Sequence, residues 1–318
     1  MSMPATNRII TSLFAGCGNT YLVMKTLSAS CDKTGFLPLV LPLWGRLQRG
    51  KAGCGRPFSA ACLVAAGVLL LMVESAAAID FYEIQIYPTE TTPPGILSLE
   101  LHSNSVISAA GAAAHAQLNP YQIHETLEGT YGLTPHLEIG QYFATAKLNN
   151  GDYEYAGSRS KCHFGIAATD AWPLKFGGNI ELDYMRRAAE EQPLTLELRP
   201  IVEASRGGLL LIANLAFEKP FRGPGTHRGF TFTPSGQISY KLLPWLAPAV
   251  EYYGDMGPLA HLPKVQEQQH FVVPTLNFFL VPQLEVNAGV GFGLTRASNG
   301  VFLKAILGWD FEVGRLLR

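Results

Sequence analysis

The chain has little charge, and beyond its first quarter it has no long hydrophobic run. Charged residues make up 15% of the 318 positions, a low share for a soluble protein. After residue 78 there is no apolar stretch of about 18 residues, the length that a membrane-spanning helix needs. The sequence instead contains 32 glycines and short apolar runs at regular spacing, which is typical of an all-β protein.

Cysteine and clustered basic residues are also scarce after residue 78. Cys162 is the only cysteine there, so it cannot form an internal disulfide, and no Cys/His spacing resembles a zinc site. Because it falls within a strand pattern, we interpret it as a small hydrophobic residue rather than a reactive thiol. This region carries 17 basic and 23 acidic residues without a basic cluster. We therefore expect no metal, no cofactor and no nucleic-acid partner.

Residues 51–78 have the pattern of an export signal. Lys51 and Arg56 give a positive start, Ala60–Val73 is apolar, and small residues at 76–78 predict cleavage near Ala78. A membrane anchor is the alternative, but about fourteen apolar residues are short for a bilayer core of about 30 Å. Residues 1–50 show no element pattern and indicate either a start codon assigned too far upstream or a long n-region. We expect export to the outer membrane of a Gram-negative bacterium.

Alternating strands fill the rest of the chain. In 194–205, Leu196 and Leu198 fall on one face while Glu197 and Arg199 fall on the other, as successive side chains of a strand do. The same analysis predicts twelve strands, at about 95–107, 120–132, 135–147, 159–170, 173–187, 194–206, 208–219, 228–241, 244–254, 268–280, 282–296 and 300–312. Each is long enough to cross a bilayer at a tilt.

The connections between these strands fall into two classes. Tight turns such as 206–208 follow every second strand, whereas the other links, such as 149–158 and 255–267, are mostly longer and polar. This rhythm is typical of outer-membrane barrels, whose short turns are periplasmic. A soluble β-sandwich is the alternative, but it does not predict the rhythm. We therefore predict a closed antiparallel transmembrane β-barrel over 95–312, with 313–318 as a C-terminal tail.

Aromatic residues gather at the side predicted to be periplasmic. Trp172, Trp245 and Trp309 lie at tight turns or near the last strand end, where amphipathic rings favour the membrane interface. The last strand ends near Phe311 and looks like the C-terminal signal that the barrel-assembly machinery reads. The chain departs from that pattern by continuing for seven residues. We expect the lipid bilayer and this machinery as partners.

Two features fit the barrel less well. Pro200, Pro234, Pro248 and Pro274 fall inside predicted strands, where proline removes a ladder hydrogen bond. We expect bulges there, or strand bounds that differ from the predicted ones. Residues 79–94 also alternate, but a thirteenth strand would make the count odd. We interpret them as a periplasmic lead-in, and an insert in the lumen is the alternative.

The polar face of the strands supplies the candidate functional residues. If alternation holds, the lumen is lined by Lys175, Asn179, Glu181, Asp183, Glu197, Arg199, Glu203, Glu251, Glu285, Asn287 and Lys304. They could line a water-filled channel, or they could pack against one another and fill a narrow barrel. Both interpretations stay open, and the sequence does not name a solute.

Three segments of the predicted strands resemble the sequences of a known protein family. The segments LELHSN (99–104), HETLEGTYGLTPHLEIG (124–140) and NAGVGFGLT (287–295) are similar to outer-membrane proteins assigned to the phenol-degradation (meta-pathway) family. The resemblance covers most of residues 80–311. It implies a barrel and a role in transport of a small solute, and it implies no catalytic residues.

A non-conducting barrel is the rival hypothesis, acting as a scaffold, an adhesin or a lipid-modifying enzyme. Outer-membrane lipid hydrolases use a His-x-Ser-Asn pattern. Here His102 and Ser103 are adjacent, so a strand points them to opposite walls and they cannot form a nucleophile–base hydrogen bond. His124 and Glu128 share a face, but no second histidine completes a metal site. We therefore predict a protein that is not an enzyme.

Overall fold

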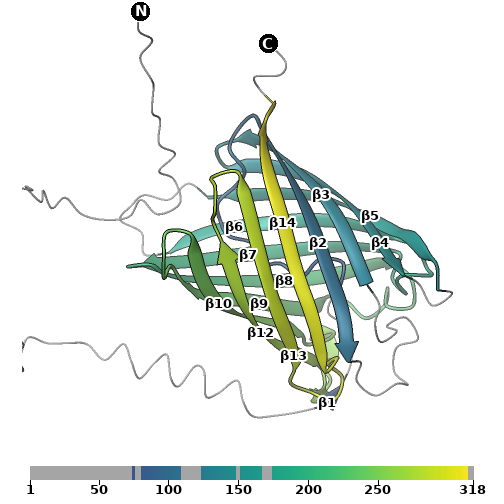
Figure 1. Ribbon diagram of the computed structural model, residues 1–318. Coiled ribbons are helices and arrows are strands. Elements are labelled where there is room, and N and C mark those ends of the chain that lie inside the picture. The colour runs from purple at the N-terminus through teal and green to yellow at the C-terminus, as the bar shows by residue number, and fades with distance from the viewer. Residues whose placement is uncertain (1–73, 76–79, 109–122, 148–150, 167–173, 314–318) are drawn as a thin grey trace, which may run out of the picture. The chain divides into compact units, whose positions relative to one another are not determined.

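The structure is a computed structural model that describes residues 74–75, 80–108, 123–147, 151–166 and 174–313. Twelve antiparallel strands form a closed barrel (Figure 1). They are β2 (Ile96–Ser108), β3 (Ile123–Thr134), β4 (Leu137–Lys147), β5 (Tyr153–Gly165), β6 (Lys175–Met185), β7 (Leu194–Arg206), β8 (Leu209–Arg222), β9 (Thr231–Tyr240), β10 (Leu246–Asp255), β12 (Gln269–Phe278), β13 (Leu284–Gly293) and β14 (Val301–Glu312). The predicted fold class is confirmed.

Three short elements lie outside the barrel wall. β1 (Glu74–Ser75) pairs in parallel with β11 (Val265–Glu267), and η1 (Leu259–His261) is a single turn of 3-10 helix. Both β11 and η1 belong to the connection between β10 and β12. Within the described part of the chain, no helix is long and apolar enough to cross a membrane.

Sequential pairing closes the barrel. Each barrel strand pairs with the next one along the chain, and β14 pairs with β2 from Val301 opposite Ser108 to Glu312 opposite Ile96. The two ends of the barrel therefore lie at the same rim, as an even number of strands requires.

The two rims differ in their connections. At the first, which we call the short-turn rim, two residues join β7 to β8 and five join β9 to β10. Gly207 and Gly208 form the tighter of these turns with φ of 57° and 88°, the left-handed geometry that a two-residue hairpin needs. At the opposite rim, the long-loop rim, the connections 186–193, 223–230 and 256–268 are longer. These connections have the predicted rhythm of short and long links. The links next to β5 do not, because five residues (148–152) join β4 to β5 at the long-loop rim and nine (166–174) join β5 to β6 at the short-turn rim.

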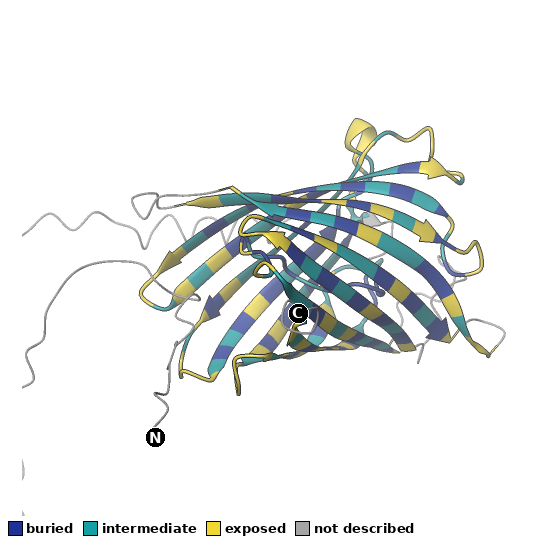
Figure 2. Ribbon diagram, turned by 90° about the horizontal axis from the view of Figure 1, so that it is seen from above, coloured by how far each residue is buried: buried dark blue, intermediate teal, exposed yellow. Residues whose placement is uncertain are grey.

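Alternation along the strands gives the barrel a polar inner wall and an apolar outer wall. In β7, buried Thr195, Glu197 and Arg199 alternate with half-exposed Leu196 and Leu198. Figure 2 shows the same alternation of buried and exposed residues along the other strands. Large apolar residues on the outer wall are exposed, which suits contact with lipid rather than water.

Most predicted strands agree with the structure to within three residues, and β5 is the exception. It begins at Tyr153, six residues before the predicted start at Arg159. The polar link predicted over 149–158 is therefore wrong from residue 153 onward. Tyr153 and Tyr155 point outward at this edge and continue the alternation. The glycines and charges nearby made the segment resemble a loop.

The four prolines were expected to mark bulges or misplaced strand bounds, and both expectations are wrong. All four lie inside β7, β9, β10 and β12, and the strand register does not shift at any of them. Each stands where the pairing on one side is interrupted or has ended. The β7–β8 pairing passes from Leu198 to Ile201, and the β10–β9 pairing begins only after Pro248. The missing N–H thus costs few ladder bonds.

Residues 80–94, which we call the lumen segment, lie inside the barrel and not in the periplasm. They contain no regular secondary structure, yet Phe81, Ile84 and Tyr87 are at most 2% exposed. These side chains form the hydrophobic core together with inward residues of the wall, Val106, Ile201, Ile212, Tyr253, Phe271, Val273 and Phe302. The interpretation of this segment as a periplasmic lead-in is therefore wrong, and the alternative, an insert in the lumen, describes it. The alternating pattern failed to distinguish the two because most side chains on both faces of residues 81–89 are buried.

Glycines in the wall allow the lumen segment to approach closely. A Cβ atom at Gly132 would lie 2.2 Å from the carbonyl oxygen of Pro93, and one at Gly165 would lie 2.4 Å from that of Thr89. Such distances are shorter than van der Waals contact, so a side chain at either position would push the segment away. The wall is therefore shaped to hold it.

Candidate functional site

Side chains of the wall bind the backbone of the lumen segment. Because this backbone has no strand partner, its buried N–H and C=O groups need other bonds. Asn214 of β8 supplies two of them, accepting from the Tyr87 N–H and donating to the Tyr87 carbonyl, both at 2.8 Å. Glu203 accepts from the N–H and the hydroxyl of Thr89 at 3.0 and 2.9 Å. The segment is thus held by side chains rather than by a ladder.

Two arginines hold the acidic residues near the start of the segment. Arg159 of β5 forms ion pairs with Asp80 and Glu83 and binds Asp183 of β6 at 2.6 Å. Arg199 of β7 lies 3.8 Å from Glu83 and forms two hydrogen bonds to Glu197. The guanidinium groups therefore link the segment to three strands of the wall. Planar forks with several donors suit such shared carboxylate sites.

A second charged cluster lies between the lumen segment and the short-turn rim. Lys161 donates to Glu128 at 2.5 Å and lies 3.3 Å from Glu138. His102 contacts Glu128 at 3.1 Å, and His163 contacts Glu138 at 3.0 Å. Every side chain here is buried. We call these five residues the paired cluster, because each carboxylate has a cationic or imidazole partner.

One group of residues in this region has the geometry of a metal site. Ligand atoms of Glu100, His102 and Glu128 lie within 4.8 Å of one another. No metal was predicted from the sequence, in which these residues show no metal-ligand spacing. Lys161 already binds Glu128, so an added cation would face an ammonium group. The three residues offer suitable ligand atoms for a metal ion, but Lys161 already neutralises part of their negative charge.

The structure places most of the predicted lining residues in the interior. Eight of them are less than 10% exposed: Asn179, Glu181, Glu197, Arg199, Glu203, Glu251, Asn287 and Lys304. Asp183 is half-buried and bound to Arg159, while Lys175 is exposed at the short-turn rim and binds Glu203 at 3.2 Å. Glu285 is exposed as well. Their role as the lining of an open channel stays a prediction, since most are packed and bonded.

The aromatic residues predicted for the interface are exposed where the structure describes them. Trp245 is the last residue of the β9–β10 connection, and Trp309 and Phe311 lie near the C-terminal end of β14. All three are at the short-turn rim. Trp172 lies outside the described residues, so its placement stays a prediction.

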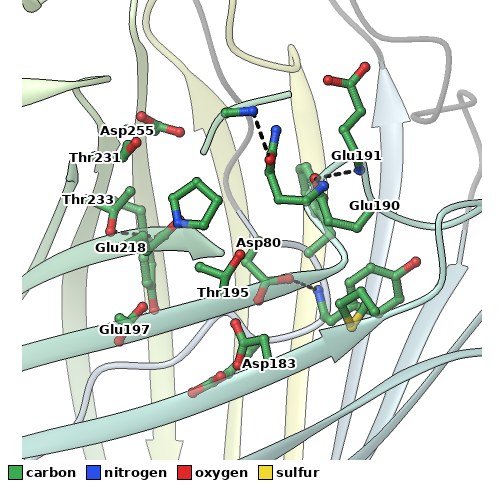
Figure 3. A pocket seen from close by; sticks show the side chains of 18 of the residues that line it. Asp80, Asp183, Glu190, Glu191, Thr195, Glu197, Glu218, Thr231, Thr233 and Asp255 are labelled. Carbon is green, nitrogen blue, oxygen red and sulfur yellow. Dashed lines mark hydrogen bonds between the residues drawn. The ribbon is translucent and has the colours of Figure 1, made fainter. Parts of the chain in front are cut away.

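The long-loop half of the lumen contains a cavity of about 370 Å³, which we call the vestibule. The lumen segment forms its floor through Asp80–Glu83, and the loops 189–192 and 225–228 contribute to its walls. Most charged residues of the lining are acidic: Asp80, Glu83, Asp183, Glu190, Glu191, Glu197, Glu218 and Asp255, against Arg159, Arg199 and Arg228. Figure 3 shows several of these acids arranged around one space.

Loop burial changes the acidity of one vestibule residue. Glu190, in the β6–β7 connection, accepts hydrogen bonds from the backbone N–H groups of Glu191 and Gln192. Burial nevertheless raises the pKa of its carboxyl to about 7, and the nearby charge of Asp80 adds to the rise. Glu190 therefore changes charge near neutral pH.

The geometry does not assemble a hydrolase site from the described residues. His102 is fully buried while Ser103 points to the outer wall, as the alternation predicted. The imidazole groups of His102, His163 and His270 bind Glu128, Glu138, Tyr252 and Gln268, and none of these bonds reaches a serine hydroxyl. Ser298 bonds instead to the backbone of His270.

Several residues of the interior were missed from the sequence. They are Glu83, Glu128, Glu138, Arg159 and Lys161, which carry most of the ion pairs described above. A usable signal existed for the wall residues, because Arg159 and Lys161 are two positions apart and share a face of β5. Glu83 had no such signal, since its segment was expected outside the barrel.

Comparisons with known proteins identify the fold. No protein-family model and no curated protein matches the chain. An outer-membrane channel from Pseudomonas putida F1 matches with a TM-score of 0.50 at 14% identity, over 72% of this chain and all of that one. The KdgM porin has a TM-score of 0.48 at 8% identity, over 67% of this chain and 99% of its own.

The NanC porin gives a TM-score of 0.45 at 8% identity, over 68% of this chain and 98% of its own. The phenol-degradation family that the sequence resembles is not confirmed by these matches. At such low identities the likeness concerns architecture alone. The chain has the fold of the outer-membrane porins and channels.

Proposed function

We propose that the protein is an outer-membrane channel for a small solute, and that the lumen segment closes its barrel in this conformation. The observation that carries the proposal is the closed barrel with an apolar outer wall and a polar inner wall that encloses a vestibule. A barrel of this kind places its polar face where a solute can pass. Neighbours with the same fold include porins, which supports the proposal at the level of architecture.

Location and processing belong to the same proposal. The export signal would be removed near Ala78, and the barrel-assembly machinery would recognise the last strand and insert the barrel with the short-turn rim in the periplasm. Cleavage there would also remove β1 and leave β11 without its partner strand. Mass spectrometry of the N-terminus from an outer-membrane fraction tests this, and a mature chain starting near residue 1 would reject it.

The attachment of the lumen segment supports a gate. Its polar contacts to the wall are mostly side-chain bonds and ion pairs, so it can leave without breaking any hydrogen bond between barrel strands. It is also the part of the described interior that has no regular secondary structure. Its apolar side chains pack in the core, so opening must also move Phe81, Ile84 and Tyr87 out of that core. We expect the channel to open when the Asn214 and Glu203 contacts are lost.

A planar-bilayer measurement of conductance tests this gate. Asn214→Leu removes both bonds to the backbone of Tyr87 and should increase the open fraction of single channels over the parent protein. Thr275→Val is the matched control, because Thr275 is a buried inward residue whose hydroxyl binds Glu251 and not the segment. It should conduct like the parent. Heat-dependent migration on gels shows that each variant is folded.

The rival function is a barrel that does not conduct, with the lumen segment as a permanent core. The specific observation in its favour is the burial of Phe81, Ile84 and Tyr87 among wall residues. If folded Asn214→Leu and the parent both fail to conduct across the whole voltage range, the channel proposal is rejected. If Asn214→Leu and Thr275→Val behave alike while the parent conducts, the channel stands and the gate is rejected.

A further inference from the structure

The vestibule has more carboxylates than the cations around it can neutralise. Arg159 and Arg199 are engaged by Asp80, Glu83, Asp183 and Glu197, as described above. Among the described residues, no ion pair reaches Glu218 or Asp255. Their bonds are from the hydroxyl of Thr233 to Glu218 at 2.9 Å and from the N–H of Gly257 to Asp255 at 2.8 Å. Both are neutral donors, and Arg228, the third cation of the lining, forms no ion pair with either residue. These two carboxyl groups therefore lack a cationic partner among the described residues.

The strand register concentrates this charge. Glu181, Glu197 and Glu218 stand directly opposite one another on β6, β7 and β8, and so form an acidic row across three strands. Like charges in opposing positions destabilise a sheet unless cations lie between them. Arg159 forms an ion pair with Glu181, and Arg199 forms one with Glu197, so the first two members of the row have a cationic partner. Glu218, the third member, faces the vestibule (Figure 3).

A buried polar atom at the same cavity has no partner either. His124 of β3 lines the vestibule, is 2% exposed, and its Nδ1 makes no hydrogen bond within the described structure. Phe81 stacks on its ring at 5.7 Å and Tyr82 packs edge-on at 4.8 Å between centroids. The imidazole is thus held in place with its Nδ1 atom unsatisfied. In the tautomer that leaves Nδ1 as an acceptor, a ligand N–H group would satisfy it.

The lining also contains aromatic rings. Phe81, Tyr82 and Tyr253 line the vestibule beside the acids. Aromatic faces next to carboxylates attract organic cations, whose charge is spread over N–H and C–H groups. The vestibule carboxylates do not meet in one metal-sized site, because the single group of described residues with that geometry lies elsewhere, at Glu100, His102 and Glu128. Its volume of about 370 Å³ is within the usual range for small-molecule sites.

We propose that the vestibule is a binding site for a small organic cation bearing ammonium or guanidinium groups. Glu218 and Asp255 bind its charged ends, and the aromatic rings contact its carbon chain. The inference deepens the proposed channel by giving the class of solute that enters from the long-loop rim. In that sense it rests on the proposed function, but binding is measured without any conduction.

Agmatine, which carries one ammonium and one guanidinium group, is a suitable probe. Titration calorimetry on the protein purified from membranes in a neutral detergent should show saturable binding of agmatine and none of glutarate. Charge-assisted contacts account for the affinity, so Glu218→Gln combined with Asp255→Asn should weaken binding by about tenfold or more. The double variant keeps the shape of both side chains and removes no cation's partner, so it should fold.

The matched control is Glu267→Gln. Glu267 belongs to the long β10–β12 connection but does not line the vestibule. A half-buried carboxylate outside the cavity should change agmatine affinity by no more than about twofold, since salt screens it. Equal losses in the control and in the double variant would mean general attraction to an acidic rim and would reject the site.

Three further outcomes are decisive. Absence of saturable agmatine binding to the parent protein rejects the inference. Displacement of agmatine by Mg²⁺ at constant ionic strength, at one ion per site, assigns the vestibule to a metal and rejects an organic cation. Binding that is lost in the double variant, in a protein that never conducts, supports the site and rejects only the channel. Conduction without agmatine binding rejects only the site.

Discussion

The two halves of the lumen use the same strands but treat charge in opposite ways. In the short-turn half, the carboxylates of the paired cluster each contact a lysine or histidine within 3.3 Å. In the long-loop half, Glu218 and Asp255 contact only neutral donors. The difference lies in the partners and not in exposure, because Asp255 and Glu138 are each 4% exposed. A buried carboxyl group without a cationic partner is costly, and in the long-loop half such groups lie beside a cavity.

This contrast indicates that the lumen segment separates a structural half from a binding half. Its residues Thr89–Thr92 face the closed half, where they bind Glu203 and Glu138. Its residues Asp80–Glu83 face the vestibule. Substitutions in the two halves should therefore have different consequences, even where the chemical change is the same.

The largest effect is expected in the closed half. Lys161→Met keeps the length of the side chain but leaves Glu128 and Glu138 without their shared ammonium group. Breaking such a buried pair costs about 3–5 kcal/mol of the free energy of unfolding. Urea unfolding of the refolded barrel in detergent measures this. Lys147→Met, at an exposed strand end, should stay within about 0.5 kcal/mol of the parent. Similar stabilities for both variants would show that the cluster is hydrated.

The contrast between the two halves requires that the polar side chains face the lumen and that the apolar side chains face lipid. The orientation of β7 tests this. Leu198 points outward near the middle of β7. Leu198→Arg should cost about 2–4 kcal/mol in a bilayer, whereas Leu209→Arg, at the short-turn rim, should cost about 1 kcal/mol or less. Unfolding in lipid vesicles gives both values. Equal costs would mean that β7 does not cross the membrane as described.

A small stabilisation is expected in the open half. Glu218→Gln removes a carboxyl group directly opposite Glu197 without depriving any cation of its partner. At a pH high enough to ionise both carboxyl groups, relief of a like-charge pair across strands is worth about 0.2–1 kcal/mol, so the free energy of unfolding should rise by that amount. The same unfolding assay applies. A loss of stability would reveal a cation bound to Glu218 and would weaken the contrast between the halves.

The smallest effect concerns pH. The pKa of Glu190 is about 7, so its carboxyl loses its charge as the pH falls from 8 to 6. Agmatine affinity should fall over the same range, and Glu190→Gln should reduce this dependence. The groups that face Glu190 are Asp80, Tyr82, Glu191 and Asp255. A pH profile of affinity that is identical in parent and variant would contradict the assignment.

The same shift affects stability with a definite sign. The folded pKa lies above the ordinary value of 4.5, so between those values the folded chain holds more protons than the unfolded chain. The contribution of Glu190 to the free energy of unfolding therefore falls as the pH rises from about 4.5 to about 7. Comparing pH titrations of stability for the parent and Glu190→Gln isolates it.

The wall of the barrel could be predicted from the sequence, but its contents could not. Leu194–Arg206 was predicted to the residue because apolar and polar positions alternate over Leu194–Arg199 and the two turn glycines follow Arg206. Alternation also placed Glu181 and Lys304 inside. The lumen segment alternates as well, with Phe81, Glu83 and Gln85 on one side. Periodicity shows which side chains share a face of a segment. Where both faces are buried, it does not show which residues of the wall each face contacts.

The partners of the charged residues were beyond reach for a related reason. Lys161 and Glu128 are 33 positions apart and meet only because β3, β4 and β5 curve around one lumen. The vestibule depends further on the loops 189–192 and 225–228, which have no period at all. Only the excess of acidic residues after position 78 hinted at it, and that count does not say where the charges gather.

The position of the lumen segment also constrains the order of assembly. The described chain runs through the lumen before it enters the wall. The lumen segment leads directly into β2, whose pairing with β14 joins the first strand to the last. The part of the barrel that is made first therefore lies inside a ring that only the strand made last completes.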